Sequence, residues 1–398
     1  MQIYQEILPY ADKQPYHAFV NLYAGDVSLS PIPPQYMQSF TVIKKADNAG
    51  TFKFAVFDRA WEEIENLLQE NYSNISFQYG HVTGRQSLVY TGMVTKYSLD
   101  FQSCGVILSA EGVYESSRGN FSLMSIDTGS NKPSEAFIQI AAEMGWQLGR
   151  VDETNAIELS STETYKLLKE HPMKYIVSQL IPQATRASDG KSGYRFILDD
   201  STTPPTASFY PPEFEADEYK TYVYQKGVNS SLVNFRLTSE GVFGGGGFYK
   251  VATQFKSVTI DPLFKSKKEN TRHINDYAET TGEYSLTHYA QSVGIVDSGG
   301  STVSQANAIL NYEVENSFPY NAQATIVGDP SIKLTEPIRI LIIKDNGMLH
   351  NASGIYTVMG ITDTIYDGTY LTNLQLTKTG VDSDASGMEL INYRNLIK

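Results

Sequence analysis

Apolar and polar residues alternate along both ends of this chain, which is the pattern of strands with one buried face. In the N-terminal region the alternating segments are 17–24, 39–44, 51–57, 75–79, 88–96 and 105–110. In the C-terminal region the strand-like segments are 231–237, 249–259, 308–314, 323–327, 337–343, 354–364 and 370–376. Among these, 337–343 is an almost unbroken apolar, β-branched run, and 354–364 and 370–376 alternate. Asp367-Gly368 lies between the last two and suits a two-residue hairpin turn, so residues 328–380 predict a β-meander.

One helix interrupts the N-terminal strands. Asp58 can cap a helix over 59–70, and the acidic side chains of its first turn suit the positive end of the helix dipole. The apolar stripe of this helix consists of Trp61, Ile64, Leu67 and Leu68. We therefore predict an all-β unit that packs a single helix.

The apolar period lengthens from about 2 to about 3.6 between residues 130 and 198, which predicts helices. Pro133 suits the first turn of a helix that Gly145 ends, and Ser160 with Glu163 fits a capping box for a second helix. A third apolar stripe, ending before Pro182, consists of Met173, Ile176, Val177 and Leu180. With short strands expected at 156–159 and 194–198, this region predicts a small α/β domain.

Two segments lack a regular period. Residues 199–218 contain four prolines and six acidic side chains, which is typical of a linker. Residues 265–305 are polar throughout, and a loop of that length inside a compact domain is usually a functional projection or a segment ordered by a partner.

These patterns predict a β-rich α+β protein. Its domains are expected at 1–125, 126–218 (with the Pro-rich acidic linker at its end) and 219–380, followed by a C-terminal tail at 381–398. Residues 90–112 and 352–380 each contain a Gly, an alternating strand, a turn and a second strand that ends at a Gly. Internal duplication and two unrelated hairpins both explain this likeness.

Composition limits the classes of function. The chain has 398 residues, 41% of them hydrophobic and 19% charged, and no apolar run long enough to cross a membrane, so we expect a soluble globular protein. Its N-terminus has no secretory signal pattern. A net charge of −13 opposes a surface that grips nucleic acid, although an acidic wall would let DNA pass without sticking. The 27 tyrosines favour a β-rich, oligomeric protein.

No catalytic motif stands out. The lone cysteine, Cys104, is expected to be a buried small side chain in a strand, and there is no GxSxG sequence. The histidines show no metal-ligand spacing; they are His17, His81, His171, His273, His288 and His350. The carboxylate pairs lie in the predicted linker, which cannot separate two pKa values; they are Asp199, Asp200, Glu213, Glu215, Asp217 and Glu218. We therefore expect no catalytic residue, no cofactor and no metal site.

A glycine run at 244–247 resembles a phosphate loop only superficially. Gly244, Gly245, Gly246 and Gly247 are flanked by strand-like residues, and no GxxxxGK[ST] pattern is present. A flexible turn or a close approach to a neighbouring subunit explains them better.

The order of the segments resembles a known family. The matching motifs are FAVFDRAWEEIENLL (54–68), YTGMV (90–94), KPSEAFIQIAAEMGW (132–146), GDPSIKL (328–334), SGIYTV (353–358) and DGTYLTNLQL (367–376). Their family-like positions are Phe57, Trp61, Gly80, Gly92, Gly328, Pro330, Gly354, Tyr356, Gly368, Tyr370 and Thr372. In this order the chain resembles the baseplate hub proteins of phage tails, which include the late control protein D group and the hub part of type VI secretion spikes.

The resemblance implies a structural role. Such hubs form homotrimers in which each chain supplies two tail-tube-like β-barrel domains, here 1–125 and 219–380, around an inserted small α/β domain. The resulting pseudo-sixfold ring would join a hexameric tail tube to a threefold central spike and initiate tube assembly. The implied partners are the tube protein, the spike and other baseplate proteins, with DNA only as transiting cargo and no membrane. The implied location is the virion tail baseplate, assembled in the host cytoplasm.

Other readings stay open. Clustered tyrosines and carboxylates would also suit a tail-associated cell-wall hydrolase or a glycan-binding host-recognition protein. A hub of a headless contractile injection system would look the same in sequence. The sequence contains no recognisable hydrolase or needle-like segment, so we expect any cell-wall hydrolase or spike to be a separate chain. The C-terminal tail at 381–398 is either a docking segment or a frayed end.

Overall fold

The computed structural model describes the following residues: 18–25, 32, 34–60, 62–71, 73–82, 84–114, 116, 125–127, 132–156, 165–167, 171–190, 193–212, 219–225, 231–239, 252–260, 267–273, 292–297, 320–345, 349–350 and 352–380. Of these, 125–127, 165–167, 225, 238–239, the strands between 252 and 297, 320–321 and 378–380 are described by their backbone alone. Trp61, the glycine run at 244–247, the segment 308–314 and the tail at 381–398 lie outside the described residues.

The first β-unit contains the N-terminal strands. They are β1 (Ala18–Ala24), β2 (Met37–Lys45), β3 (Thr51–Asp58), β4 (Asn74–His81), β5 (Tyr90–Gln102) and β6 (Gly105–Tyr114), with a short 3-10 turn η1 (Pro34–Tyr36). They pair in the order β1-β4-β5-β6-β3-β2. Alternate side chains of these strands bury an aromatic cluster around Phe52 and Phe77, whose ring centroids lie 5.2 Å apart. The alternation in sequence therefore marked the buried face.

The helix of this unit, α2 (Glu63–Glu70), starts later than the sequence predicts. Asp58 still acts as its acceptor: the carboxylate accepts hydrogen bonds from the backbone N–H groups of Ala60 and Ile64, at 2.8 and 3.0 Å. Ile64 and Leu68 are buried against the strands, as the stripe predicted. Cys104 differs from expectation, because it lies exposed in the two-residue turn between β5 and β6.

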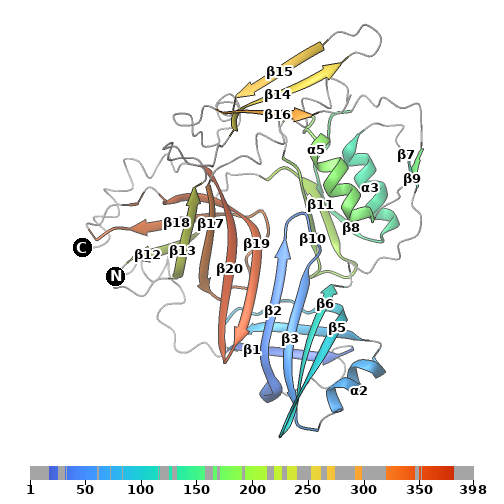
Figure 1. Ribbon diagram of the computed structural model, residues 1–398, viewed down its shortest axis with the longest axis vertical. Helices are drawn as coiled ribbons and strands as arrows, with labels where there is room; N and C mark the ends of the chain where they lie inside the picture. Colours follow the sequence, from blue (N-terminus) through green and yellow to red (C-terminus); the bar gives the residue numbers. More distant parts are fainter. Residues whose placement is uncertain are drawn as a thin grey trace.

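The middle unit places helices against a small sheet (Figure 1). Its elements are β7 (Ser125–Asp127), α3 (Pro133–Glu143), β8 (Gln147–Val151), β9 (Tyr165–Leu167), α4 (Pro172–Tyr175), the π-helical turn η3 (Ile176–Leu180), α5 (Ile181–Gln183), β10 (Arg195–Asp199) and β11 (Thr206–Tyr210). The sheet order is β10-β11-β8, and β7 pairs with β9. Phe137 of α3 stacks on Phe209 of β11 at 4.9 Å, which joins the two layers.

Three predictions for this region were wrong. Residues 165–167 form β9, where a helix from Ser160 was expected; Ser160 itself lies outside the described residues. Residues 206–210 of the expected linker form β11, because Pro204 and Pro205 precede the strand and cost it no ladder hydrogen bond. The third helix continues to Gln183, since Pro182 sits at the start of the last turn, where a missing N–H is tolerated.

The second β-unit contains β12 (Lys220–Gln225), β13 (Leu232–Ser239), β17 (Tyr320–Val327), β18 (Pro337–Ile343), β19 (Gly354–Tyr366) and β20 (Thr369–Gly380). They pair in the order β12-β18-β19-β20-β17-β13. A separate three-stranded sheet, β15-β14-β16, comes from β14 (Ala252–Ile260), β15 (Lys267–His273) and β16 (Ser292–Asp297). The polar segment 265–305 thus contains two strands that its sequence period did not reveal.

The two β-units have the same strand order. Replacing β1, β2, β3, β4, β5 and β6 by β12, β13, β17, β18, β19 and β20 converts the first order into the second. The likeness extends to register. When Tyr90 is aligned with Gly354, the bulge at Thr95 falls on the bulge at Met359. The two-residue turn of the β5–β6 hairpin then falls on that of the β19–β20 hairpin. The bulges at Gln38 in β2 and Val233 in β13 also coincide. Such agreement favours duplication over chance likeness.

One pair departs from the repeat. β1 runs antiparallel to β4, whereas β12 runs parallel to β18. The two units are also joined in one twelve-stranded sheet, because β2 pairs with β19. Among the described strands the hydrogen-bonded path runs from β1 to β13 without closing, so the structure has the predicted β-rich α+β fold but shows no closed barrel in those strands.

Candidate functional site

The best-built polar region lies where the two β-units meet. β2 and β19 pair antiparallel from Ser39 opposite Tyr366 to Lys45 opposite Gly360. Phe40 and Ile365, which are paired, share the core of the first unit. The joint between the units is therefore a continuous sheet with a shared apolar core, and we call it the β2–β19 joint.

Asp363 of β19 is the buried charge at the β2–β19 joint. Its carboxylate accepts hydrogen bonds from the hydroxyls of Tyr79 at 2.7 Å, Tyr370 at 2.9 Å and Thr372 at 2.6 Å. Burial raises the pKa of this carboxyl, and nearby Lys44 and the three hydroxyls oppose that rise. Tyr79 belongs to the first unit, so the carboxylate ties the two units together.

Lys44 of β2 supplies the positive charge of the joint. Its Nζ donates to the Tyr90 hydroxyl at 2.7 Å and lies 4.3 Å from the centre of that ring. Burial lowers the pKa of Lys44, but attraction to Tyr90 and Asp363 outweighs it, and the net direction is upward. The partly buried Lys44 and the buried Asp363 thus stabilise each other's charged forms across the joint.

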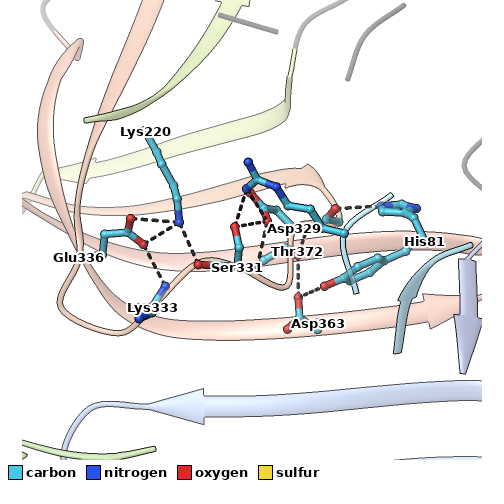
Figure 2. Close-up of polar contacts among 11 residues, drawn as sticks. His81, Lys220, Asp329, Ser331, Lys333, Glu336, Asp363 and Thr372 are labelled. Carbon is cyan, nitrogen blue, oxygen red and sulfur yellow. Dashed lines mark hydrogen bonds and ion pairs between the residues drawn. The ribbon is translucent and has the colours of Figure 1, made fainter. Parts of the chain in front are cut away.

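The GDPSIKL loop covers one end of the joint (Figure 2). His81 Nε2 lies 2.9 Å from the carbonyl oxygen of Gly328, and Arg85 Nη1 lies 3.2 Å from the Asp329 carboxylate. The backbone N–H of Asp329 donates to Thr372 Oγ1 at 3.0 Å, so the loop connects to the Asp363 cluster. Gly328 is required for close approach, since a Cβ there would lie 2.1 Å from the Tyr370 ring.

The other end of the loop is held by Glu336. Lys220 Nζ contacts its carboxylate at 3.0 Å and donates to the Ser331 carbonyl at 2.9 Å, while the backbone N–H of Lys333 donates to the same carboxylate at 3.0 Å (Figure 2). The loop is thereby fixed to β12 on one side and to β4 on the other.

The middle unit docks beside the same joint. Asp47, which follows β2, accepts from Arg195 Nη1 at 2.9 Å and from the Phe196 N–H at 2.8 Å. The Tyr210 hydroxyl lies 2.8 Å from Thr335 Oγ1 of the second unit. A cavity of about 460 Å³ remains between the three units, with Lys44, Asp199 and Lys333 among its lining residues.

The chemistry of this region is that of a structural joint. The Asp363 carboxylate is occupied by three hydroxyls, and its pKa shift has an ordinary cause in burial. Within the described ranges no group of three or more His, Cys, Asp or Glu side chains could hold a metal ion. No helix in the described part of the chain is long and apolar enough to span a membrane.

The structure gathers some of the family-like positions and scatters others. Gly328, Tyr370 and Thr372 meet at the Asp363 cluster, and Pro330 lines the neighbouring cavity. Those in the strands and turns of the two units are Phe57, Gly80, Gly92, Gly354, Tyr356 and Gly368. Trp61 and the run Gly244 to Gly247 lie outside the described residues.

Sequence reasoning missed the residues that hold the joint together. Asp363, Lys44, Tyr79 and Asp47 lie in ordinary alternating strands or turns, and only their long-range pairing makes them partners. One signal was present: Asp363 occupies a buried-face position of β19, where an acidic residue needs a partner.

Solved structures with the same fold include phage tail proteins and a chain of a PdpA–VgrG complex. The tail protein from Neisseria meningitidis MC58 matches with a TM-score of 0.57 and 10% identity, over 91% of this chain and 97% of that one. The 43 kDa tail protein of prophage MuSo2 from Shewanella oneidensis matches with a TM-score of 0.55 and 10% identity, over 90% and 98%.

A chain of the half-lidded Francisella PdpA–VgrG complex matches with a TM-score of 0.52 and 8% identity, over 95% of this chain and 61% of that one. No protein-family model and no curated protein sequence matches this chain. At such low identity, a match over nearly the whole chain reports on fold. The chain has the fold of phage tail proteins and of a chain of the PdpA–VgrG complex.

Proposed function

We propose that the chain is a non-enzymatic structural component of a phage tail: a homotrimeric baseplate hub that joins a hexameric tail tube to a threefold spike. Residues 1–125 and 219–380 are its two ring-forming units, each closing into a tube-like barrel in the assembly, and 126–218 is the inserted unit. The internal repeat carries this proposal. Each chain holds two copies of one strand order side by side, so three chains present six similar units.

The polar contacts of the joint support a structural role. Asp363 of the second unit accepts a hydrogen bond from Tyr79 of the first unit and attracts Lys44 of the first unit, so this carboxylate holds the two units together. Glu336 is engaged by Lys220 within the second unit and holds the GDPSIKL loop in place. No enzyme activity is required of them. The work of a hub lies in interface geometry, which needs a rigid connection between its two ring-forming units.

The partners and location follow from this role. The tube protein, the spike and other baseplate proteins contact the hub in the virion tail, and DNA crosses its centre only as cargo. The direct test is the mass of the purified protein in solution and within tail particles. Trimers in both are expected, whereas a stable monomer inside a purified tail would refute the proposal.

A second candidate comes from the fold shared with the PdpA–VgrG complex: the hub of a phage-like contractile injection system. Capsid genes beside the gene for this chain favour the phage hub, and their absence beside an otherwise complete tail cluster favours the injection system. A peptidoglycan zymogram separates both from a wall hydrolase, since clearing at the mass of this chain would contradict a purely structural role.

A further inference from the structure

The repeat predicts two equivalent strand pairings between β-units. One of them is formed inside the chain, and the other is absent among the described strands. Inside the chain, β2 of the first unit pairs with Gly360–Tyr366 of β19 in the second unit. The repeat equates β2 with β13 and β19 with β5. The equivalent pairing would therefore join β13 to residues 96–102 of β5.

Both strands have an edge available for that pairing. β4 pairs with β5 only from Tyr90 to Met93, and from Lys96 to Asp100 the described ladders join β5 to β6 alone. β13 pairs with β17 and ends the sheet path. The two edges lie at opposite sides of the molecule (Figure 1), so one copy cannot join its own edges. Paired edges would also remove two exposed strand edges, which are otherwise prone to aggregation.

We propose that β13 of one copy pairs antiparallel with the outer half of β5 of the next copy, repeating the β2–β19 joint between chains. The inference rests on the proposed ring, and it names the strands and the register that close it. Each copy offers one β5 edge and one β13 edge, so the contact is head-to-tail and closes when the last copy meets the first.

The repeat fixes the register residue by residue. Within the chain, Phe40 of β2 lies opposite Ile365 of β19. The repeat equates Phe40 with Phe235 and Ile365 with Phe101, so Phe235 of one copy would lie opposite Phe101 of the next. The pairs that follow from this register are Gln102 with Asn234, Phe101 with Phe235, Asp100 with Arg236 and Leu99 with Leu237.

The side chains that this register places opposite each other are chemically complementary. An amide faces an amide, an aromatic ring faces an aromatic ring, and the exposed Asp100 faces the exposed Arg236. A slip of one residue would place Arg236 opposite an apolar side chain. Cross-strand pairs of opposite charge and of aromatic rings stabilise a sheet, and like charges in the same place destabilise it.

Exposure points to the same contact. Phe101 is 66% exposed, whereas its counterpart Ile365, which packs in the core across the β2–β19 joint, is 6% exposed. Pairing with β13 would bring Phe101 beside Phe235, which packs on the core of the second unit. Burying such an exposed ring removes apolar surface from water, which favours the contact.

The joint between chains also differs from the joint within the chain in a consistent way. In the joint between chains, Leu99 takes the position that Asp363 has within the chain. Ile342 takes the position of Tyr79, because the backbone N–H of His350 donates to Ile342 just as that of Ser87 donates to Tyr79. The buried carboxylate–hydroxyl contact is thus replaced by an apolar one. Assembly of separate chains then needs no buried charge.

A thiol cross-linking experiment tests the strand pairing on the full chain. In a Cys104→Ser background, Gln102→Cys and Asn234→Cys are introduced together and separately, and a short bis-maleimide is added. The double variant is expected to give covalent dimers and trimers, and neither single variant is expected to cross-link. Cross-linking of the Gln102→Cys single variant would indicate β5–β5 pairing about a two-fold axis and overturn the proposal.

Charge reversal tests the register. Asp100→Arg and Arg236→Asp are each expected to abolish the trimer in sedimentation, and the two together are expected to restore it. Lys53→Glu is the matched control, because Lys53 forms an exposed ion pair with Glu111 elsewhere on the first unit and should leave the trimer unchanged.

The outcomes separate this inference from the proposed function. A trimer that survives both single reversals and gives no cross-link in the double cysteine variant overturns the β5–β13 contact while leaving the hub in place. A wild-type chain that stays monomeric at high concentration and inside purified tails overturns both.

Discussion

At the scale of single residues, the joint between the two β-units depends on side chains that meet only after folding. Asp363 accepts three hydroxyl hydrogen bonds and lies within reach of the charge of Lys44, so a costly buried carboxylate is compensated by partners from both units. Removing one partner of a buried hydrogen bond costs more free energy than the bond contributes, because the remaining partner is left buried and unsatisfied.

Asp363→Asn tests this compensation. The amide has one acceptor oxygen where the carboxylate has two, so the hydroxyl of Tyr79 or those of Tyr370 and Thr372 would face an N–H₂ group. We expect a loss of about 2–3 kcal/mol in the free energy of unfolding, measured in urea. Thr325→Ala, which removes an exposed hydrogen bond to Asn373, is the control. Equal stability of the two variants would contradict the role given to Asp363.

Asp200 gives the protein a pH dependence of stability. Burial raises the pKa of its carboxyl to about 7, above the value of about 3.9 in an unfolded chain. The folded state therefore holds this proton more tightly, and the group's contribution to stability is full below about pH 4 and is lost as the pH rises to about 7. The raised pKa of Asp363 acts in the same direction.

Asp200→Asn removes the titrating group. We expect the variant to exceed the wild type in stability by roughly 1–3 kcal/mol above about pH 7, and the difference to vanish toward about pH 4. Urea unfolding across this range measures both proteins. Parallel stability curves for the two proteins would show that the Asp200 carboxyl does not titrate in the folded state as described.

Gly328→Ala tests how closely the GDPSIKL loop approaches β20. The added methyl group would lie 2.1 Å from the ring of Tyr370, which is itself buried beside Asp363. We expect the free energy of unfolding to fall by about 2–3 kcal/mol, because the added methyl group would displace a ring that is held in place by its neighbours. Gly360→Ala is the matched control, because its Cβ would meet the flexible end of the Gln375 side chain. Thermal unfolding measures both, and a tolerated Gly328→Ala would disprove the close approach.

At the scale of elements, local period predicted strands better than it predicted their partners. The hairpins β5–β6 and β19–β20 were foreseeable because alternation and a Gly in the turn or directly after it are local signals. β11 and β12 were missed because prolines and acidic residues beside them resemble a linker. The pairing of β2 with β19 joins residues more than half the chain apart, and no local pattern specifies it. The candidate site was unpredictable for the same reason.

The middle unit is held to the first β-unit through Asp47, which accepts hydrogen bonds from β10. Asp47 has a φ of 62°, a conformation that Asn also tolerates, so Asp47→Asn changes the charge without straining the turn. We expect weaker contact with Arg195 and Phe196, and faster limited proteolysis between the first β-unit and the middle unit. Glu111→Gln, at an exposed ion pair, should leave the cleavage rate unchanged. An unaltered cleavage rate in Asp47→Asn would show that other contacts hold the unit.

At the scale of the whole molecule, the repeat explains why a chain of this fold suits a position between two symmetries. Two units with one strand order, joined by a β-sheet, give each chain two similar building blocks. The same joint made between chains by β13 and β5 would continue the sheet around a ring. The differences between the units, including the opposite direction of β12 and β1 relative to their neighbours, would mark the threefold symmetry.

The most direct measurement is an electron cryo-microscopy map of the assembled full-length chain, accompanied by its mass. We expect three copies of the 44.3 kDa chain in a ring of six similar β-units, with alternate units identical. A monomer in purified tails, a ring of six chains, or a trimer in which the two β-units of each chain do not lie in one ring would contradict it.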